Sequence, residues 1–187
     1  MAVVYNFAGN SAIDQGADWY ATFIYKQPAQ ITNITGDGTT VTFTAVNGFT
    51  AGQTVSIDGV LPWVYNLQDV TISAVTPTSF QVVNGATGNY ISGGIATAPV
   101  DITGFSAALQ LRSTPNSPTA VLDLTTDNGG IDIPNGTDGV INVHATAAQT
   151  GAIDEGPYVY DLEITSPYNI VTRVSQGQAV ISAEVTQ

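Results

Sequence analysis

The sequence predicts an all-β protein: an immunoglobulin-like β-sandwich with an inserted small β-barrel-like module and almost no helix. Runs of alternating apolar and polar residues recur along the 187 residues, separated by turns rich in Gly, Asn, Asp and Pro. A period of two is typical of strands that bury one face. Charged residues make up only 10% of the chain, against about 25% in an average domain, so the Lys and Glu that amphipathic helices expose are scarce.

The predicted strands follow one another at short intervals, which is typical of sandwiches and small barrels. One short helical turn is expected over 145–153, where Ala and Gln in ATAAQTGAI interrupt the β-branched pattern. The strands are expected at 18–26, 40–46, 53–58, 69–75, 79–84, 105–113, 119–126, 140–145, 158–165, 170–177 and 179–186.

Composition changes near Pro28 and Pro99, and these positions delimit two expected domains. The segment 29–98 is nearly free of charge and rich in Gly, Thr and Val. We predict that it is an inserted small β module of about five strands, closed as a barrel so that no edge strand is exposed. The flanking segments, 1–28 plus 99–187, are expected to form a discontinuous β-sandwich docking domain.

The N-terminal residues 1–12 combine the apolar VVYNF with the loop-like AGNSA. We expect an extended arm that reaches toward a neighbouring subunit, although an edge strand buried on the chain's own sandwich would have the same pattern. Trp19, in the alternating ADWYATF, is expected in the core or in packing between subunits.

Two carboxylates in EGPYVYDLEIT raise the question of catalysis. Asp161 and Glu163 share one face of the expected strand 158–165, about 7 Å apart, a separation that overlaps the range for glycoside hydrolysis. A catalytic pair requires one carboxyl group in an apolar pocket, which raises its pKa. Alternation places both on the face opposite Tyr160 and its apolar neighbours, so we predict a solvated strand face.

The sequence offers no candidate residues for nucleophilic catalysis or for a transition-metal site. His144 is the only histidine and cysteine is absent, so neither a nucleophile with an adjacent base nor a histidine-based or thiolate metal site is expected. We predict that the protein is not an enzyme, with no catalytic residue and no cofactor. His144 is expected to pack or hydrogen-bond at a strand end.

Calcium is the one metal that the sequence makes worth considering. The loop TTDNGGIDIPNGTDG, residues 125–139, is rich in side-chain oxygens. Its spacing does not fit the EF-hand template, so turns stabilised by Asp and Asn side chains are the favoured interpretation, and no metal site is predicted. The oxygen-bearing residues are Asp127, Asn128, Asp132, Asn135 and Asp138.

The charge balance excludes two classes of partner. Lys26, Arg112 and Arg173 face 15 acidic residues, for a net charge of −12. Three scattered cations cannot form the basic patch that nucleic acid or an anionic membrane requires. The N-terminus lacks the pattern of a signal peptide, and no segment approaches the roughly 20 apolar residues of a membrane span, so folding in a cytoplasm is expected.

A few side chains are candidates for interaction. In GVLPWVYN, residues 59–66, Trp63 and Tyr65 follow a glycine and a proline; they either cap the core of the module or, with Tyr90, form a contact surface. Arg112 and Arg173 lie near strand ends, where each could pair with Asp161, Glu163 or Asp101, or across a subunit interface.

Five segments carry a family resemblance in chain order: IDQGADWYATFIYK, DITGFSAALQLRS, VLDLTT, HATAAQTGAIDEGPYVYDLEIT and TRVSQGQAVISAEVT. Together they resemble a family of tailed-phage virion structural proteins, and the immunoglobulin-like attachment domains of phage baseplate and tail proteins. The resemblance implies a closing hairpin in the last segment. Through FTAGQTVSIDGV and YNLQDVTISAVTPTSFQV, the insert resembles small β-barrel modules of phage tail and fibre proteins. Many members of the family lack an insert.

This resemblance implies a non-enzymatic virion structural protein of a tailed phage, assembled in the host cytoplasm. It would bind other virion proteins as a capsid decoration or cement protein, or as a tail or baseplate accessory. Symmetric homo-oligomers such as trimers are expected, because phage heads and tails impose symmetry on their components. The alternative is a module that binds a host-surface glycan through Trp63, Tyr65 and Tyr90 of the inserted barrel.

Overall fold

A computed structural model describes residues 3–184 and is mostly β, with one short α-helix. The chain divides into two compact units. The first, here called the two-sheet unit, comprises the residues up to Tyr25 together with those from Asp101 onward. The second, the barrel unit, is the continuous segment Lys26–Val100.

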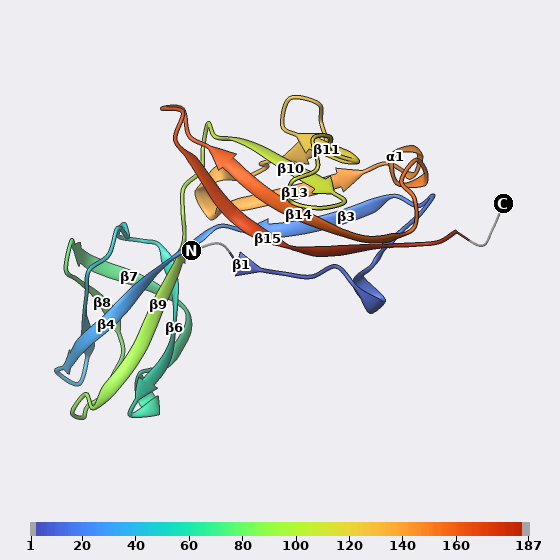
Figure 1. Cartoon of the computed structure of the whole chain (residues 1–187). Helices are drawn as coiled ribbons and strands as arrows, with labels where there is room; N and C mark the ends of the chain where they lie inside the picture. The colour runs from blue at the N-terminus through green and yellow to red at the C-terminus, as the bar shows by residue number, and fades with distance from the viewer. Residues whose placement is uncertain (1–2, 185–187) are drawn as a thin grey trace. The chain divides into compact units, whose positions relative to one another are not determined.

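The two-sheet unit contains two open sheets. The larger has six strands in the order β1-β15-β14-β10-β11, with β2 also paired to β15. The smaller has three strands in the order β12-β13-β3. Figure 1 shows the long strands β14 and β15, which pair along most of their length. The bounds are β1 (Val3–Val4), β2 (Ile13–Asp14), β3 (Trp19–Ile24), β10 (Ser106–Arg112), β11 (Leu122–Thr125), β12 (Ile131–Asp132), β13 (Val140–Ala145), β14 (Gly156–Thr165) and β15 (Val171–Ser182).

The alternation of apolar and polar residues in the sequence corresponds to one buried face on each strand. In β10, Ala107, Leu109 and Leu111 are buried, whereas the residues between them are partly exposed. The same pattern holds in β13 and in the second half of β14. Burial of these apolar side chains is the main favourable contribution to the stability of the unit.

The expected helical turn is confirmed as α1 (Ala147–Gly151). Thr146 begins it with a capping box: its side chain accepts a hydrogen bond from the Gln149 N–H, and the Gln149 side chain accepts one from the Thr146 N–H. These two bonds satisfy donors that a helix start leaves free. Two 3₁₀ turns, η1 (Gly9–Ser11) and η3 (Gly136–Asp138), complete the unit.

The closing hairpin expected at 170–186 is wrong, because β15 is one continuous strand. It pairs antiparallel with β14, and Gly177 lies directly opposite Tyr160. Gly177 looked like the start of a turn, but its role is to admit another part of the chain: a Cβ atom there would overlap the main-chain carbonyl of Tyr5.

The extended arm expected for residues 1–12 is also wrong for the described part of that segment. β1 pairs parallel with β15. Further along, the Phe7 N–H donates to Gln178 O at 2.8 Å, and the Val180 N–H donates to Phe7 O at 2.7 Å. The Phe7 side chain is only 6% exposed. Residues 3–7 are therefore held on the chain's own unit by main-chain hydrogen bonds to β15 and by burial of the Phe7 ring, whereas Val3 and Val4 stay exposed.

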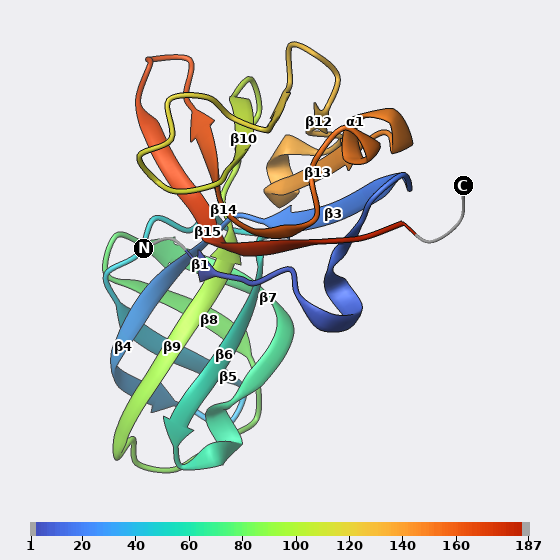
Figure 2. The same ribbon diagram turned by 45° about the vertical axis from the view of Figure 1, so that its right-hand side comes forward.

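The barrel unit is a closed barrel in the order β4-β5-β8-β7-β6-β9. The predicted closure is confirmed, with six strands where about five were expected. Figure 2 shows β4, β9 and β6 side by side, as their pairing requires. The bounds are β4 (Lys26–Gly36), β5 (Thr40–Ala45), β6 (Thr54–Leu61), β7 (Leu67–Thr76), β8 (Ser79–Val83) and β9 (Ser92–Pro99), with a 3₁₀ turn η2 (Trp63–Tyr65) between β6 and β7.

Aromatic side chains fill the barrel. Phe43 and Phe80 are fully buried and stack with ring centroids 5.2 Å apart. Phe49 meets Phe80 edge to face at 5.5 Å, and Tyr65 meets Phe43 in the same manner at 6.5 Å. Such pairs add to the stabilisation from burial alone, so the barrel unit has a core of its own.

Candidate interaction surfaces

Both arginines of the two-sheet unit line one hollow of about 490 Å³, together with Asp161 and Glu163. β10 contributes Arg112, and β14 and β15 contribute the acidic residues and Arg173. The fold thus brings together Arg112 and Arg173, which the sequence predicted separately as interaction residues. Trp63, Tyr65 and Tyr90 belong to the other unit.

Arg173 forms ion pairs with both of the carboxylates that raised the question of catalysis. Its Nη2 lies 3.1 Å from Asp161 Oδ2 and 3.2 Å from Glu163 Oε1. A register shift after Leu162 sets Glu163 directly opposite Arg173. All three side chains are between one third and one half exposed, so each pair contributes only about 0–1 kcal/mol to stability. The predicted solvated strand face is confirmed.

Arg112 does not make the expected ion pair. It donates from Nη1 to Ser117 O at 2.6 Å and from Nη2 to Gln110 Oε1 at 2.7 Å, which fixes the loop after β10. Asp101, the third predicted partner of Arg112, instead accepts hydrogen bonds from Thr103 in a turn. These bonds, from the Thr103 hydroxyl and backbone N–H, lower the pKa of the Asp101 carboxyl. Among the described residues, Arg112 therefore serves as a donor to neutral oxygens.

The three aromatic residues predicted as a contact surface separate in the barrel unit. Tyr65 is 0% exposed, and its hydroxyl donates to Gly88 O at 2.8 Å. Tyr90 is half-buried, and its hydroxyl contacts the carbonyl oxygens of Gly93 at 3.0 Å and Ile31 at 3.2 Å. Only Trp63 faces solvent, with 78% of its surface exposed. Tyr65 therefore closes the core, whereas Trp63, two residues earlier in η2, points outward.

Trp63 is one of four exposed apolar residues in η2, at the end of β6 and just before β9, a group that the sequence did not predict. Ile91 is 71% exposed, and its N–H donates to Leu61 O at 2.9 Å, which joins the loop before β9 to the end of β6. Such a cluster is typical of a contact surface, because soluble proteins seldom group large apolar side chains in water. We call this surface the barrel-end patch; it consists of Leu61, Trp63, Val64 and Ile91.

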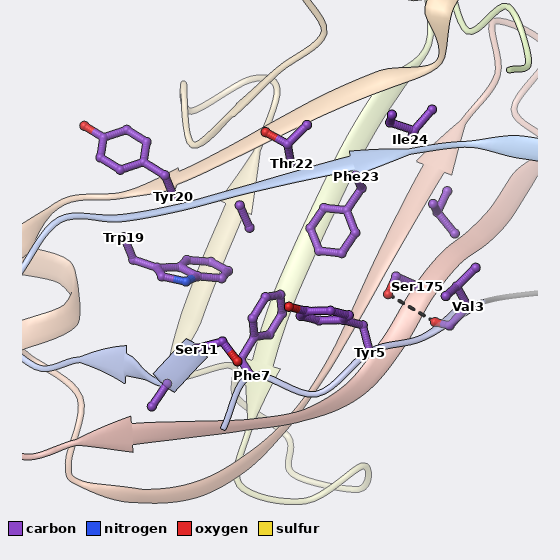
Figure 3. A pocket seen from close by; sticks show the side chains of 13 residues that line it. Val3, Tyr5, Phe7, Ser11, Trp19, Tyr20, Thr22, Phe23, Ile24 and Ser175 are labelled. Carbon is purple, nitrogen blue, oxygen red and sulfur yellow. Dashed lines mark hydrogen bonds between the residues drawn. The ribbon is translucent and has the colours of Figure 1, made fainter. Parts of the chain in front are cut away.

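A groove of about 540 Å³ in the two-sheet unit was also missed. It lies between β3 and the N-terminal segment, and we call it the edge groove. Figure 3 shows Trp19 and Phe23 pointing from β3 toward Phe7 and Tyr5. The Phe7 ring meets Trp19 edge to face at 5.1 Å and Phe23 at 6.2 Å. Trp19 is buried within its own unit, which confirms the core alternative for this residue.

Two buried hydroxyl groups hold the N-terminal segment beside the groove. Tyr160 donates to Tyr5 O at 3.0 Å, and Ser175 donates to Val3 O at 3.1 Å. Burial raises the pKa of Tyr160, although its hydrogen bond with Ser175 partly opposes that shift. The signal that could have indicated this contact is a serine on the apolar side of a strand, where only a hydrogen-bonded polar group is tolerated.

His144 has the packing role expected of it. Its ring stacks on Tyr20 with centroids 4.4 Å apart and an angle of 6° between the planes, and Nε2 lies 4.0 Å from Asp18 Oδ1.

In the loop considered for calcium, Asn128 Oδ1 accepts hydrogen bonds from the N–H groups of Thr125 and Gly130. Residues 3–184 contain no group of three or more His, Asp or Glu side chains placed to hold a metal ion.

No protein-family model and no curated protein matches this chain. Within the described part of the chain, none of the helices has the length and apolar character needed to cross a membrane. The fold and surfaces define the class: a mostly β protein of two separately cored units, each with an exposed apolar surface.

Proposed function

We propose that the chain is a non-enzymatic structural protein of a tailed-phage virion. Its two open sheets would correspond to the immunoglobulin-like sandwich of phage attachment domains, with the barrel as an insert. Docking to other virion proteins would make it either a capsid decoration or cement protein, or a tail or baseplate accessory. The support from sequence is the ordered resemblance along both segments of the two-sheet unit.

The observation that carries the proposal is that each unit has its own core and its own apolar surface. The barrel unit presents the barrel-end patch, and the two-sheet unit presents the edge groove. A protein that links two partners needs two such surfaces, and apolar side chains with aromatic anchors dominate protein interfaces. Repeated positions in a virion would favour symmetric copies of the chain, such as trimers.

Immunogold labelling of intact phage particles, with an antibody raised against the whole chain, tests the proposal. Label over the head supports a decoration or cement protein, and label on the tail supports an adaptor or baseplate component. The proposal fails if purified particles carry neither the label nor peptides of the chain in mass spectrometry.

Glycan binding by the barrel is the second candidate, and the exposure of Trp63 favours it, since Trp stacks on sugar rings. Tyr65 is buried and would not contribute. Binding of the wild type to a glycan array, lost in Trp63→Ala and kept in Val83→Ala, would support this candidate. Val83 is a suitable control because it is an exposed apolar residue of the same unit. A wild-type protein that binds no glycan would eliminate the candidate.

A further inference from the structure

β3 is an edge strand with a free row of main-chain groups. Among residues 3–184, it pairs only with β13. The Tyr25 N–H donates to Gly139 O, and in an antiparallel pair the hydrogen-bonded positions alternate from there. Phe23 and Ala21 therefore bond to β13, whereas Tyr20, Thr22 and Ile24 direct their N–H and C=O groups away from it. An exposed edge of this kind is a template for another strand.

The edge groove lies along this free edge. All six residues of β3 line it. Consecutive residues of a strand point to opposite faces, so six in a row can line one groove only if the edge itself faces it. The opposite wall includes Val3, Tyr5 and Phe7. Figure 3 shows Trp19 and Phe23 on the groove side, with Tyr20, Thr22 and Ile24 on the other side of the strand.

We propose that an extended segment of another virion protein adds to β3 as a further strand, with alternate residues apolar and basic. The apolar residues would enter the groove beside Phe23, and main-chain hydrogen bonds would form with Tyr20, Thr22 and Ile24. This inference rests on the proposed function, since it specifies how the two-sheet unit docks, and it identifies the partner by its chemistry.

Charge determines the basic character of the incoming strand. No charged side chain of the described residues lines the groove, so the face turned into it must be apolar. Of the chain's 15 acidic residues, only Asp37, Asp58 and Asp69 lie in the barrel unit, which leaves 12 with two arginines in the two-sheet unit. Asp18, with a side chain 53% exposed, directly precedes β3. A second copy of this chain would bring like charges together, whereas a basic strand would find opposite charges.

Tyr20 offers a specific position for a cation. Its side chain is 68% exposed, although one face of the ring stacks on His144. A Lys or Arg beside Tyr20 on the added strand could lie over the remaining face and close to Asp18. Cation–π contact and charge attraction would then act on the same side chain.

Peptide binding to the whole chain tests the proposal. Two pooled synthetic libraries are used, each about ten residues long so that a peptide spans β3 at about 3.3 Å per residue. Both alternate Val, Ile or Phe with polar residues, which are Lys, Arg and Thr in one library and Glu, Asp and Thr in the other. We expect binding from the basic library and increased protection of the Tyr20, Thr22 and Ile24 amides from hydrogen exchange. Absence of that binding, or equal binding of both libraries, would overturn the proposal.

Thr22 provides a matched pair of variants. Thr22→Pro removes an edge N–H at a position where proline is tolerated, and it should weaken the binding of a selected peptide roughly tenfold or more. Thr22→Val keeps the N–H while losing the hydroxyl donor to Asn142 Oδ1 at 2.9 Å, and it should bind like the wild type. Equal binding by both variants would contradict pairing at this edge. If Thr22→Pro does not fold, as judged by circular dichroism, the amide protection in the wild type decides.

Two further results separate this inference from the proposed function. A Thr22→Pro chain that still attaches to particles would overturn the edge pairing and leave the structural role in place. A wild-type chain absent from particles would remove the structural role itself. Dimers of the wild type that Thr22→Pro abolishes would show that a second copy occupies the edge, which contradicts the basic partner.

Discussion

The hydroxyl groups of Tyr160 and Ser175 lie 2.9 Å apart, in the place where the first described residues of the chain meet β15. Each hydroxyl also contacts a main-chain carbonyl oxygen, Tyr5 O for Tyr160 and Val3 O for Ser175. The two hydroxyl protons can make only two of these three contacts full hydrogen bonds at one time. The arrangement fixes the N-terminal segment, and with it one wall of the edge groove.

Tyr160→Phe should destabilise the two-sheet unit by about 1–2 kcal/mol, because a buried hydrogen bond to Tyr5 O is lost. Denaturant unfolding measures the change. Tyr158→Phe is the matched control: its hydroxyl donates to Asp154 O in a more exposed position, so the effect should be smaller. Equal losses in the two variants would show that the Tyr160 hydroxyl has no special role.

Gly177→Ala should displace the N-terminal segment, because the added methyl group would overlap the Tyr5 carbonyl. We expect faster hydrogen exchange at the Phe7 amide, which donates to Gln178 O, and a lower free energy of unfolding. Gly151→Ala is the control, since its Cβ would lie 3.5 Å from the nearest atom, Gly16 Cα, an ordinary contact. Unchanged exchange at Phe7 in Gly177→Ala would contradict this account.

The turn between β4 and β5 should respond to acid. Hydrogen bonds from the Thr40 N–H, then from the Thr39 hydroxyl and N–H, lower the pKa of Asp37 from 3.8 to about 2. A carboxyl whose pKa is lowered by folding contributes stability that is fully present above pH 3.8. That contribution is lost as the pH falls through about 2.

Titration of the Asp37 carboxyl by NMR checks the pKa directly. In unfolding measurements, Asp37→Asn should remove part of the acid dependence of the barrel unit between pH 3.8 and about 2. Asp58→Asn is the control in the same unit, because Asp58 accepts its hydrogen bond from the side chain of Gln68. A midpoint for Asp37 near 3.8 would refute the role of the turn hydrogen bonds.

Trp63 and Tyr65 should differ sharply in their effect on stability. Trp63→Ala removes an exposed side chain and should change the free energy of unfolding by less than about 0.5 kcal/mol. Tyr65→Ala empties a fully buried position and should cost about 3–5 kcal/mol. Thermal unfolding of both variants compares them. A large loss in Trp63→Ala would mean that Trp63 supports the barrel core rather than a contact surface.

Local patterns were sufficient for strands that alternate strictly. β5, β10 and β13 lie within the expected ranges because every second side chain is apolar and buried. β4 and β9 were missed for two physical reasons. A register shift between Ile31 and Asn33 breaks the alternation in β4, and Gly93 and Gly94 in β9 adopt the left-handed backbone that usually marks a turn. At Gly94 a Cβ would also collide with Val60.

The surfaces depended on contacts that no local pattern contains. The edge groove requires residues 3–7 to lie on β15, so that Ser175 meets Val3 across almost the whole chain. The separation of Trp63 from Tyr65 depends on the short turn of η2. The sequence offered Asp161, Glu163 and Asp101, or a partner across a subunit interface, as alternatives for Arg173, and the structure pairs Arg173 with the first two.

The parallel pairing of β1 and β2 with β15 determines the order in which parts of the chain can fold during synthesis. β1 and β2 cannot bind this partner until β15 has left the ribosome. The barrel unit is one continuous segment and has its strand partners within it. We expect the barrel to fold before β15 has been synthesised, while β1 and β2 are still unpaired. The two-sheet unit should therefore be the slower of the two units to fold and the more prone to aggregation.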